Sequence, residues 1–207
     1  MALLYFLTHP EVHIDPAVPV PQWGLSERGF ERMRALLERP WTRSLAGVWS
    51  STEQKARDGA LLLGAASGVE HRELEQLGEN DRSATGFLPP EEFQRTADEF
   101  FARPKESVRG WERAVDAQSR VVGAVERVLQ TAQAENLSGD LCVVAHGGVG
   151  ALLLAHLKGA PISRALDQPG GGGGCVYAFE RESRALAFGW RTIEDELLSA
   201  GSTPPQP

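Results

Sequence analysis

Two apolar runs end in a histidine: Ala2-Leu-Leu-Tyr-Phe-Leu-Thr-His9 and Leu141-Cys-Val-Val-Ala-His146. Each run has the composition of a short buried β-strand, and helix-breaking residues follow at once, Pro10 in one case and Gly147-Gly148 in the other. The carboxyl ends of strands line the ligand crevice of an open parallel sheet, so both histidines can reach one site. Imidazole suits nucleophilic or proton-transfer chemistry near neutral pH. The pair therefore predicts a catalytic centre rather than two unrelated loop histidines.

Strands and helices alternate along the N-terminal part of the chain. Ser26 is a good N-cap for an amphipathic helix, and Pro40 follows the end of that helix. Such alternation is typical of a parallel sheet with helices on both faces, so we expect a three-layer α/β/α fold with a mostly parallel central sheet. The expected elements are a helix over 26–38, a strand over 45–49, a helix capped by residues 50–52 and running to about 64, and a strand over 69–74.

The alternation is interrupted by residues 80–105, a polar and turn-rich stretch that contains one predicted helix near 91–101. We interpret this stretch as a lid insertion on the crevice side, because long loops in compact domains are usually functional or disordered and its phenylalanines favour packing. Further on, the pattern predicts helices over 107–134 and 149–157 and a terminal hairpin over 175–179 and 185–190. We expect one domain over 1–198 and a disordered tail over 199–207.

The composition is that of an ordinary soluble protein, with 207 residues, 42% hydrophobic and 24% charged. The only two cysteines, Cys142 and Cys175, suggest no disulfide framework, and no metal-ligand spacing is present. No run has the length of a membrane span or the features of a signal peptide, so we expect a cytoplasmic protein without a membrane partner. The net charge of −7 and the lack of a basic block argue against nucleic acid. The oligomeric state is left open.

Five short motifs, in this order, resemble the signatures of the histidine phosphatase superfamily, which has the phosphoglycerate mutase-like fold. The resemblance extends over about residues 3–180. The motifs are Leu7-Thr-His-Pro10 for a strand ending in Arg-His-Gly, Leu25-Ser-Glu-Arg-Gly29 for Leu-Thr-x-x-Gly, Ser50-Ser-Thr-Glu-Gln-Lys-Ala56 for Ser-Ser followed by Arg-Ala, Leu77-Gly-Glu79 for the acid element, and Val143-Val-Ala-His-Gly-Gly148 for His-Gly-Gly.

The resemblance implies a metal-independent mechanism without an organic cofactor. His9 would attack phosphorus and form a phosphohistidine, with its other ring nitrogen held by a backbone carbonyl. His146 would donate a hydrogen bond to the equatorial phosphoryl oxygens. Glu79 would protonate the leaving oxygen and then activate water, a role that needs a raised pKa. Glu73 and Glu75 lie close enough in the sequence to remain alternatives for this acid.

The phosphate-binding group implied by the resemblance is Thr8, Lys55, Arg82 and Gly147. Here Thr8 and Lys55 stand where the family has arginines, so two bidentate donors become a hydroxyl and a point charge. Loss of one such donor costs roughly 10²–10³ in rate. Arg82 is the preferred compensating residue, and Arg57 is the alternative.

These features support three readings. The first is a phosphohydrolase that acts on a small phosphomonoester; a mutase is less favoured because a second phosphate needs more positive charge. The second is a catalytically impaired member of the family that binds a phosphorylated ligand or a protein partner, as the residues at positions 8 and 55 suggest. The third is an ester hydrolase, which the lack of a Gly-x-Ser-x-Gly elbow disfavours.

Overall fold

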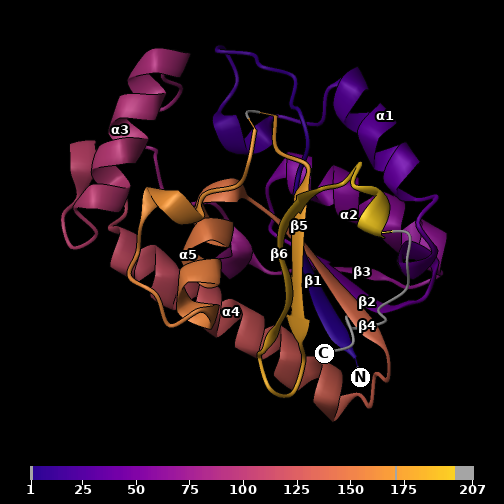
Figure 1. The fold of residues 1–207 in the computed structure, drawn as a ribbon. Coiled ribbons are helices and arrows are strands. Elements are labelled where there is room, and N and C mark those ends of the chain that lie inside the picture. The colour runs from indigo at the N-terminus through magenta and orange to yellow at the C-terminus, as the bar shows by residue number, and fades with distance from the viewer. Residues whose placement is uncertain (1, 171, 199–207) are drawn as a thin grey trace.

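The computed structural model describes residues 2–170 and 172–198, and these form a three-layer α/β/α fold (Figure 1). The central sheet has the order β3-β2-β4-β1-β5-β6. Strands β3, β2, β4 and β1 pair in parallel, whereas β5 and β6 are antiparallel to their neighbours, so the expected α/β class with a mostly parallel sheet is confirmed. The strands are β1 Leu3–Thr8, β2 Leu45–Ser50, β3 His71–Glu73, β4 Asp140–Ala145, β5 Cys175–Glu180 and β6 Leu186–Thr192.

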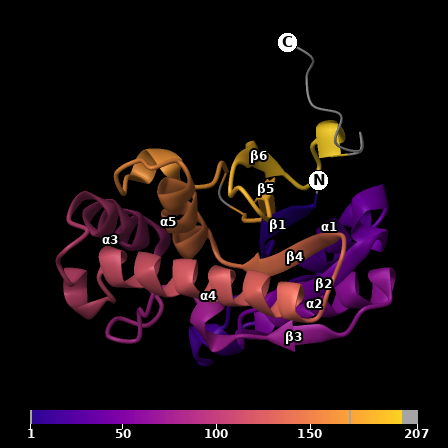
Figure 2. The same cartoon turned by 90° about the horizontal axis from the view of Figure 1, so that it is seen from below.

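Helices cover both faces of the sheet, α1 and α2 on one side and α4 and α5 on the other (Figures 1 and 2). Helix α3 belongs to the inserted stretch and lies at the side of the molecule that carries α5. The helices are α1 Glu27–Leu36, α2 Gln54–Ser67, α3 Pro90–Ala102, α4 Ala114–Ala134 and α5 Gly147–Leu157.

Strands β1 and β4 form the centre of the sheet and are almost entirely buried. Burial on both faces explains why their sequences read as continuous apolar runs rather than as alternating patterns. Their parallel register pairs Thr8 with Ala145. Because the two strands end at the same level, the next residues, His9 and His146, emerge side by side at one edge of the sheet.

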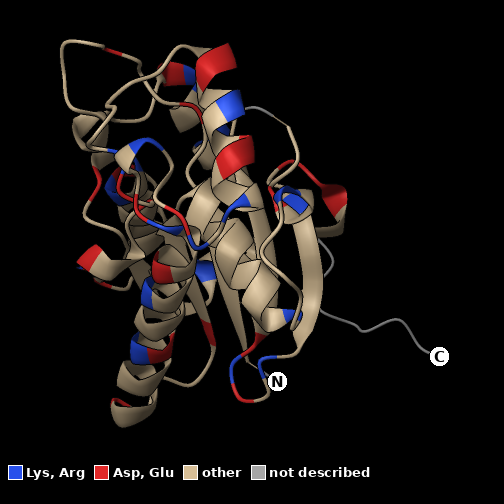
Figure 3. Ribbon diagram, turned by 90° about the vertical axis from the view of Figure 1, so that its left-hand side faces the viewer, with Lys and Arg blue, Asp and Glu red and all other residues tan. Residues whose placement is uncertain are grey.

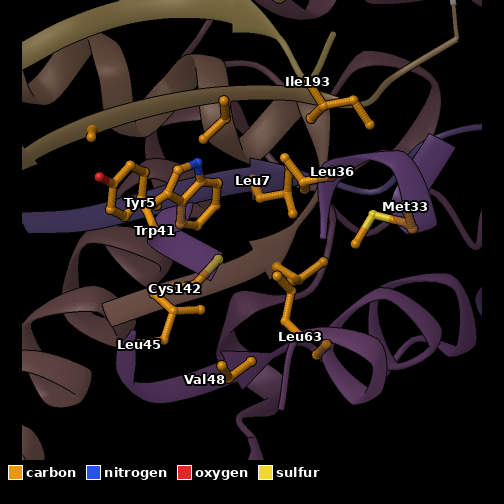
Figure 4. Close-up of a cluster of buried hydrophobic side chains, with 14 of the residues drawn as sticks. Tyr5, Leu7, Met33, Leu36, Trp41, Leu45, Val48, Leu63, Cys142 and Ile193 are labelled. Carbon is orange, nitrogen blue, oxygen red and sulfur yellow. The ribbon is translucent and has the colours of Figure 1, made fainter. Parts of the chain in front are cut away.

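The core between the sheet and the α1–α2 layer is built from aromatic and aliphatic side chains (Figure 4). Tyr5 of β1 stacks on Trp41 with ring centroids 4.1 Å apart, while Met33 and Leu63 reach in from α1 and α2. Each fully buried aliphatic side chain of this kind contributes about 1.5–3 kcal/mol. This packing fixes the strands whose ends carry the histidines.

Two helices begin at positions that differ from the predictions. The helix expected from residue 107 begins at Ala114, because Arg109 and Gly110 adopt left-handed backbone conformations (φ 53° and 82°) that interrupt it. The helix expected from 149 begins at Gly147. The glycines after His146 thus form its first turn, where N–H groups need no partner within the helix.

The predicted cap of α2 was also wrong. Strand β2 continues through Ser50, and Glu53 is the N-cap residue of a helix that starts at Gln54. In contrast, Ser26 caps α1 as expected, since its Oγ accepts a hydrogen bond from the Gly29 N–H at 3.1 Å.

Residues 80–105 pack against the rest of the fold. Phe100 and Phe101 of α3 join Trp111 and two residues in the middle of α5, Ala151 and Leu152, in a third buried hydrophobic cluster. The predicted helix is confirmed as α3, but the role of the stretch as a lid stays a prediction. The tail predicted over 199–207 lies outside the described residues.

Acidic and basic residues are interspersed over the face that carries α3 and α4 (Figure 3). Among residues 2–170 and 172–198, no helix combines the length and the apolar character that crossing a membrane requires.

Gly29 of the second motif lets the loop after β1 approach α1 closely. A Cβ at this position would lie 2.2 Å from the Glu11 carbonyl oxygen, whereas a Cβ on Gly123, in exposed α4 backbone, would meet nothing within 4 Å. Gly29→Ala should therefore lower the free energy of unfolding by roughly 1–3 kcal/mol. Gly123→Ala, the matched control, should raise it by about 0.5–1 kcal/mol. Urea unfolding of both variants checks this, and equal effects would contradict the contact.

Candidate active site

His9 lies half-buried at the end of β1, and its ring is fixed by the backbone. Its Nδ1 lies 2.8 Å from the Pro10 carbonyl oxygen. Because that oxygen can only accept a hydrogen bond, Nδ1 carries the proton and Nε2 keeps a free lone pair. Burial, and then the charges of His146 and Lys55, lower the pKa of His9 from 6.5 to about 3. The imidazole is therefore neutral at physiological pH.

The backbone of His9 is held from two sides, by strand β4 and by the glycine run before β5. Its N–H donates to the Ala145 carbonyl at 3.1 Å, and its carbonyl accepts from the Gly174 N–H at 3.1 Å. Gly173 has φ +66°, and a Cβ there would lie 2.2 Å from the His9 oxygen. Part of the glycine run before β5 thus packs directly against the histidine.

His146 lies beside His9, with ring centroids 5.2 Å apart and an edge-to-face arrangement. Its Nε2 is 2.8 Å from Ser51 Oγ and 3.2 Å from Glu53 Oε1. Burial lowers the pKa of His146 and outweighs the opposite effect of Glu53 and Glu79. Its Nδ1 is buried and has no hydrogen-bond partner in the part of the chain that the structure describes.

Glu53 is a site residue that the sequence analysis missed. Its Oε2 lies 2.5 Å from Lys55 Nζ, and its Oε1 accepts the Glu79 N–H at 2.9 Å. Burial would raise the pKa of Glu53, but positive charge from His146 and Lys55 outweighs it and holds the pKa at about 2. Near pH 7 His146 is neutral, because burial lowers its pKa, and Lys55 is then the counter-charge that Glu53 faces. In the sequence, an acidic residue at a helix start is indistinguishable from an ordinary cap.

Lys55 is buried in the same cluster but is committed to protein partners. Besides Glu53, its Nζ donates to the carbonyl of Val20, at 2.9 Å. The lysine expected to bind phosphate therefore holds a carboxylate and the Val20–Gln22 turn, although its charge still acts on His9.

Glu79 lies at the N-terminus of α5. Its two oxygens accept the N–H groups of Gly148 and Val149, each at 3.0 Å, and Arg82 lies 3.1 Å away. A Cβ on Gly148 would come within 2.7 Å of the carboxylate, so this approach requires glycine. Burial would raise the pKa of Glu79, but Arg82, His146 and the backbone donors lower it. The raised pKa that the role needs is thus absent without phosphate, because Arg82 and the helix terminus both stabilise the anion, and a rise on phosphate binding stays a prediction.

Arg82 is held in a fixed position. Its guanidinium donates twice to Asn80 Oδ1, at 2.9 and 2.8 Å, and lies over the rings of Phe93 and Trp111, about 5 Å from each centroid. The alternative, Arg57, instead pairs with a surface glutamate. The structure thus brings Arg82 to the cluster and leaves Arg57 outside it.

Thr8 is buried and its hydroxyl is occupied. It accepts the Cys175 N–H at 2.9 Å and donates to Gln168 Oε1 at 2.7 Å. The amide of Gln168 lies against Gly147, where a Cβ would be 2.4 Å from Nε2. Gln168 is a second residue that the sequence analysis missed, because its loop carries no motif.

Removing the negative charge of Glu53 should destabilise the folded protein, because the buried Lys55 then loses its counter-ion. Glu53→Gln leaves a buried ammonium without its counter-ion, which costs roughly 3–5 kcal/mol of unfolding free energy. The double variant Glu53→Gln/Lys55→Met should recover most of the loss. As the control, Glu73→Gln, in a partly exposed pair, should cost at most about 1 kcal/mol. Urea unfolding measures all three, and a Glu53→Gln loss no larger than the control would contradict the buried pair.

The same variant has a defined pH dependence. The pKa of Glu53 lies below its ordinary value of 4.5 in the folded protein, at about 2. Its contribution is therefore complete above pH 4.5 and is lost as the pH falls from there toward 2. The difference in unfolding free energy between wild type and Glu53→Gln should shrink over that range, and a constant difference would contradict an ionised Glu53.

Comparisons with known proteins agree with the geometry. Residues 16–189 match the model of the histidine phosphatase superfamily (branch 1). A search among curated proteins finds no match to this chain.

Solved structures with this fold include a mycobacterial glucosyl-3-phosphoglycerate phosphatase (TM-score 0.70, 23% identity, covering 92% of this chain and 96% of that one). Bacillus stearothermophilus YhfR is similar as well (TM-score 0.72, 21% identity, 90% and 94%). So is the alpha-ribazole phosphatase from Shigella flexneri (TM-score 0.65, 17% identity, 97% and 99%). At these identities the likeness shows the fold alone. With the family match over most of its length, the chain belongs to the histidine phosphatase superfamily.

Proposed function

We propose that this protein hydrolyses a small phosphomonoester through a phosphohistidine on His9. The observation that carries the proposal is the state of His9: it is neutral, it lies half-buried beside His146, and its Nε2 lone pair is free because the proton is on Nδ1 and is donated to the Pro10 carbonyl. A neutral imidazole in a fixed tautomer is a competent nucleophile without further activation. The glucosyl-3-phosphoglycerate and alpha-ribazole phosphatases of the same fold are named for small phosphorylated substrates, which supports this substrate class.

The reaction has two steps. In the first, the Nε2 lone pair of His9 attacks phosphorus, a P–N bond forms, and the ester P–O bond breaks, with the electron pair going to the leaving oxygen. In the second, water attacks the phosphohistidine, the P–N bond breaks, and His9 returns to its neutral form. Arg82 supplies donors for the phosphoryl oxygens, and His146 donates as well in the tautomer that carries its proton on the unpartnered Nδ1, with Nε2 accepting the hydroxyl proton of Ser51.

Glu79 suits the second step better than the first. Its pKa is lowered in the unliganded protein, so the carboxylate is ready to take a proton from the attacking water. Protonation of a leaving oxygen needs the acid form, which arises only when phosphate adds negative charge nearby. Aryl phosphates, whose leaving groups depart as stable anions, should therefore be favoured over alkyl phosphates.

Residues 80–105 are proposed as a lid over this site. The segment supplies Arg82 at its start, and its Phe87 contacts Trp23 of the loop after β1, with ring centroids 5.6 Å apart. That loop also carries the Val20 carbonyl bound by Lys55. This contact between the segment and the loop after β1 supports the lid role, in which the segment would select the leaving group.

A second candidate is a catalytically impaired protein that binds a phosphorylated ligand or a protein partner. It is favoured by one observation: the two positions where the family has arginines are engaged internally, Thr8 with Gln168 and Lys55 with Glu53. Little positive charge is then left uncompensated next to His9.

Turnover of p-nitrophenyl phosphate in the presence of a chelator separates these candidates. Wild type should hydrolyse it and form an acid-labile phosphoenzyme, and His9→Ala should abolish both. His13→Ala, an exposed histidine, is the matched control and should be unaffected. Folded wild type that is silent at high concentration, yet binds inorganic phosphate, would favour the binding role. Loss of activity with the chelator would contradict metal independence.

Glu79→Gln should lower kcat by roughly 10²–10⁴, because the base for the second step is lost, and phosphoenzyme should accumulate. Glu75→Gln, an exposed neighbour in the same segment, should leave kcat unchanged. Rapid-quench measurement of the two steps checks the assignment. If Glu75→Gln lowered kcat and Glu79→Gln did not, the catalytic base would be Glu75.

A further inference from the structure

Gln168 touches the neighbours of both histidines, although it lies on a loop far from them in the sequence. Its side-chain oxygen accepts from Thr8, the residue before His9. Its side-chain nitrogen lies against Gly147, the residue after His146. The amide therefore spans the gap between the ends of β1 and β4, where the phosphoryl group of a substrate on His9 would be held.

The hydrogen bonds of Thr8 orient this amide. Because the Thr8 hydroxyl accepts the Cys175 N–H at 2.9 Å, its proton points to another acceptor. Gln168 Oε1 lies at 2.7 Å and the Cys175 carbonyl at 3.2 Å, so the amide oxygen is the better acceptor. Nε2 then points away from Thr8, and no acceptor for it is found among residues 2–170 and 172–198.

The loop that carries Gln168 is anchored at several points. The Gln168 N–H donates to Asp167 Oδ1 at 2.8 Å, and Asp167 pairs with Arg164 at 3.0 Å. The indole N–H of Trp190 donates to the Leu166 carbonyl at 2.9 Å. The amide is thus preorganised, so little conformational entropy is lost when it binds a ligand.

Close approach of the amide also depends on Gly147. A Cβ there would lie 2.4 Å from Nε2 and 2.9 Å from the amide carbon, which is closer than real contacts allow. Glycine therefore leaves room for Gln168 in particular, in addition to beginning α5.

We propose that Gln168 Nε2 donates a hydrogen bond to a phosphoryl oxygen of the substrate, in place of the guanidinium that the family signature has before the nucleophile. Thr8 is a positioning residue that holds the amide with its donor toward the ligand. This inference rests on the proposed phosphohydrolase function and deepens it. Since an amide carries no net charge, the site binds the phosphoryl group by directed hydrogen bonds more than by bulk attraction.

The test uses p-nitrophenyl phosphate as substrate and inorganic phosphate as inhibitor. Gln168→Met keeps the shape of the side chain and removes the donor, so KM and the phosphate inhibition constant should rise about 10- to 100-fold. Gln168→Glu should be worse, because a carboxylate repels phosphate. Gln130→Met, on the exposed surface of α4, is the matched control and should behave as wild type.

The role of Thr8 is tested by the same readouts. Thr8→Val should raise KM as Gln168→Met does, and Thr8→Ser, which keeps the hydroxyl, should restore most of the loss. Thr8→Val/Gln168→Met should be no worse than Gln168→Met alone, because Thr8 acts through the amide. Additive losses in KM would show that Thr8 acts independently and would overturn this part of the inference.

Phosphate binding by calorimetry separates this inference from the proposed function. If wild type binds phosphate without turning over substrate, and Gln168→Met weakens that binding, the function fails and the contact stands. If wild type is active but Gln168→Met changes neither KM nor phosphate affinity, the contact is overturned and the function stands. Wild type that binds no phosphate overturns the contact as well.

Discussion

The parallel pairing of β1 with β4 is the constraint on which the site depends. Thr8 lies opposite Ala145, and the His9 N–H donates to the Ala145 carbonyl at 3.1 Å, so the strands end together and deliver both histidines to one edge. A shift of one residue in this register would turn one histidine toward the opposite face of the sheet. Continuous burial of both strands on both faces holds the register, which links the apolar runs in the sequence directly to the geometry of His9 and His146.

Charge in the crevice is balanced locally rather than spread over the surface. Lys55 is paired with Glu53, and Arg82 with Glu79, so the two side-chain cations of the cluster each face a carboxylate. With a net charge of −7, the protein offers an anion no long-range attraction. In the function that we propose, recognition of a phosphoryl group therefore relies on directed donors: the imidazole of His146, the guanidinium of Arg82 and the amide of Gln168.

The sequence was sufficient for features set by local pattern. The alternation of elements, the Ser26 cap and the meeting of His9 with His146 all follow from periodicity and strand ends. It was insufficient where a contact joins distant segments, as between Thr8 and Gln168, which are 160 residues apart. The lowered pKa of Glu79 in the absence of phosphate could not be predicted for the same reason, since it depends on contacts with Arg82 and with the N–H groups of α5, a helix whose start was misplaced. No sequence pattern distinguishes Glu53 from an ordinary acidic residue at the start of a helix, and its contacts with Lys55 and His146 join it to the site only in the folded protein.

Thr8, which stands where the family signature has an arginine before the proposed nucleophile, therefore does more than leave out a positive charge. The Thr8 hydroxyl accepts the N–H of Cys175 in β5 and donates to the amide oxygen of Gln168. Thr8 is also only 1% exposed, so the space that a longer side chain would need is already occupied. A cation at position 8 would have to displace the amide and would leave the Cys175 N–H without its acceptor, at a cost of about 1–3 kcal/mol for a buried donor. Threonine at 8, glutamine at 168 and glycine at 147 are thus mutually dependent. A change at any one of them is expected to act on the phosphoryl pocket through the other two.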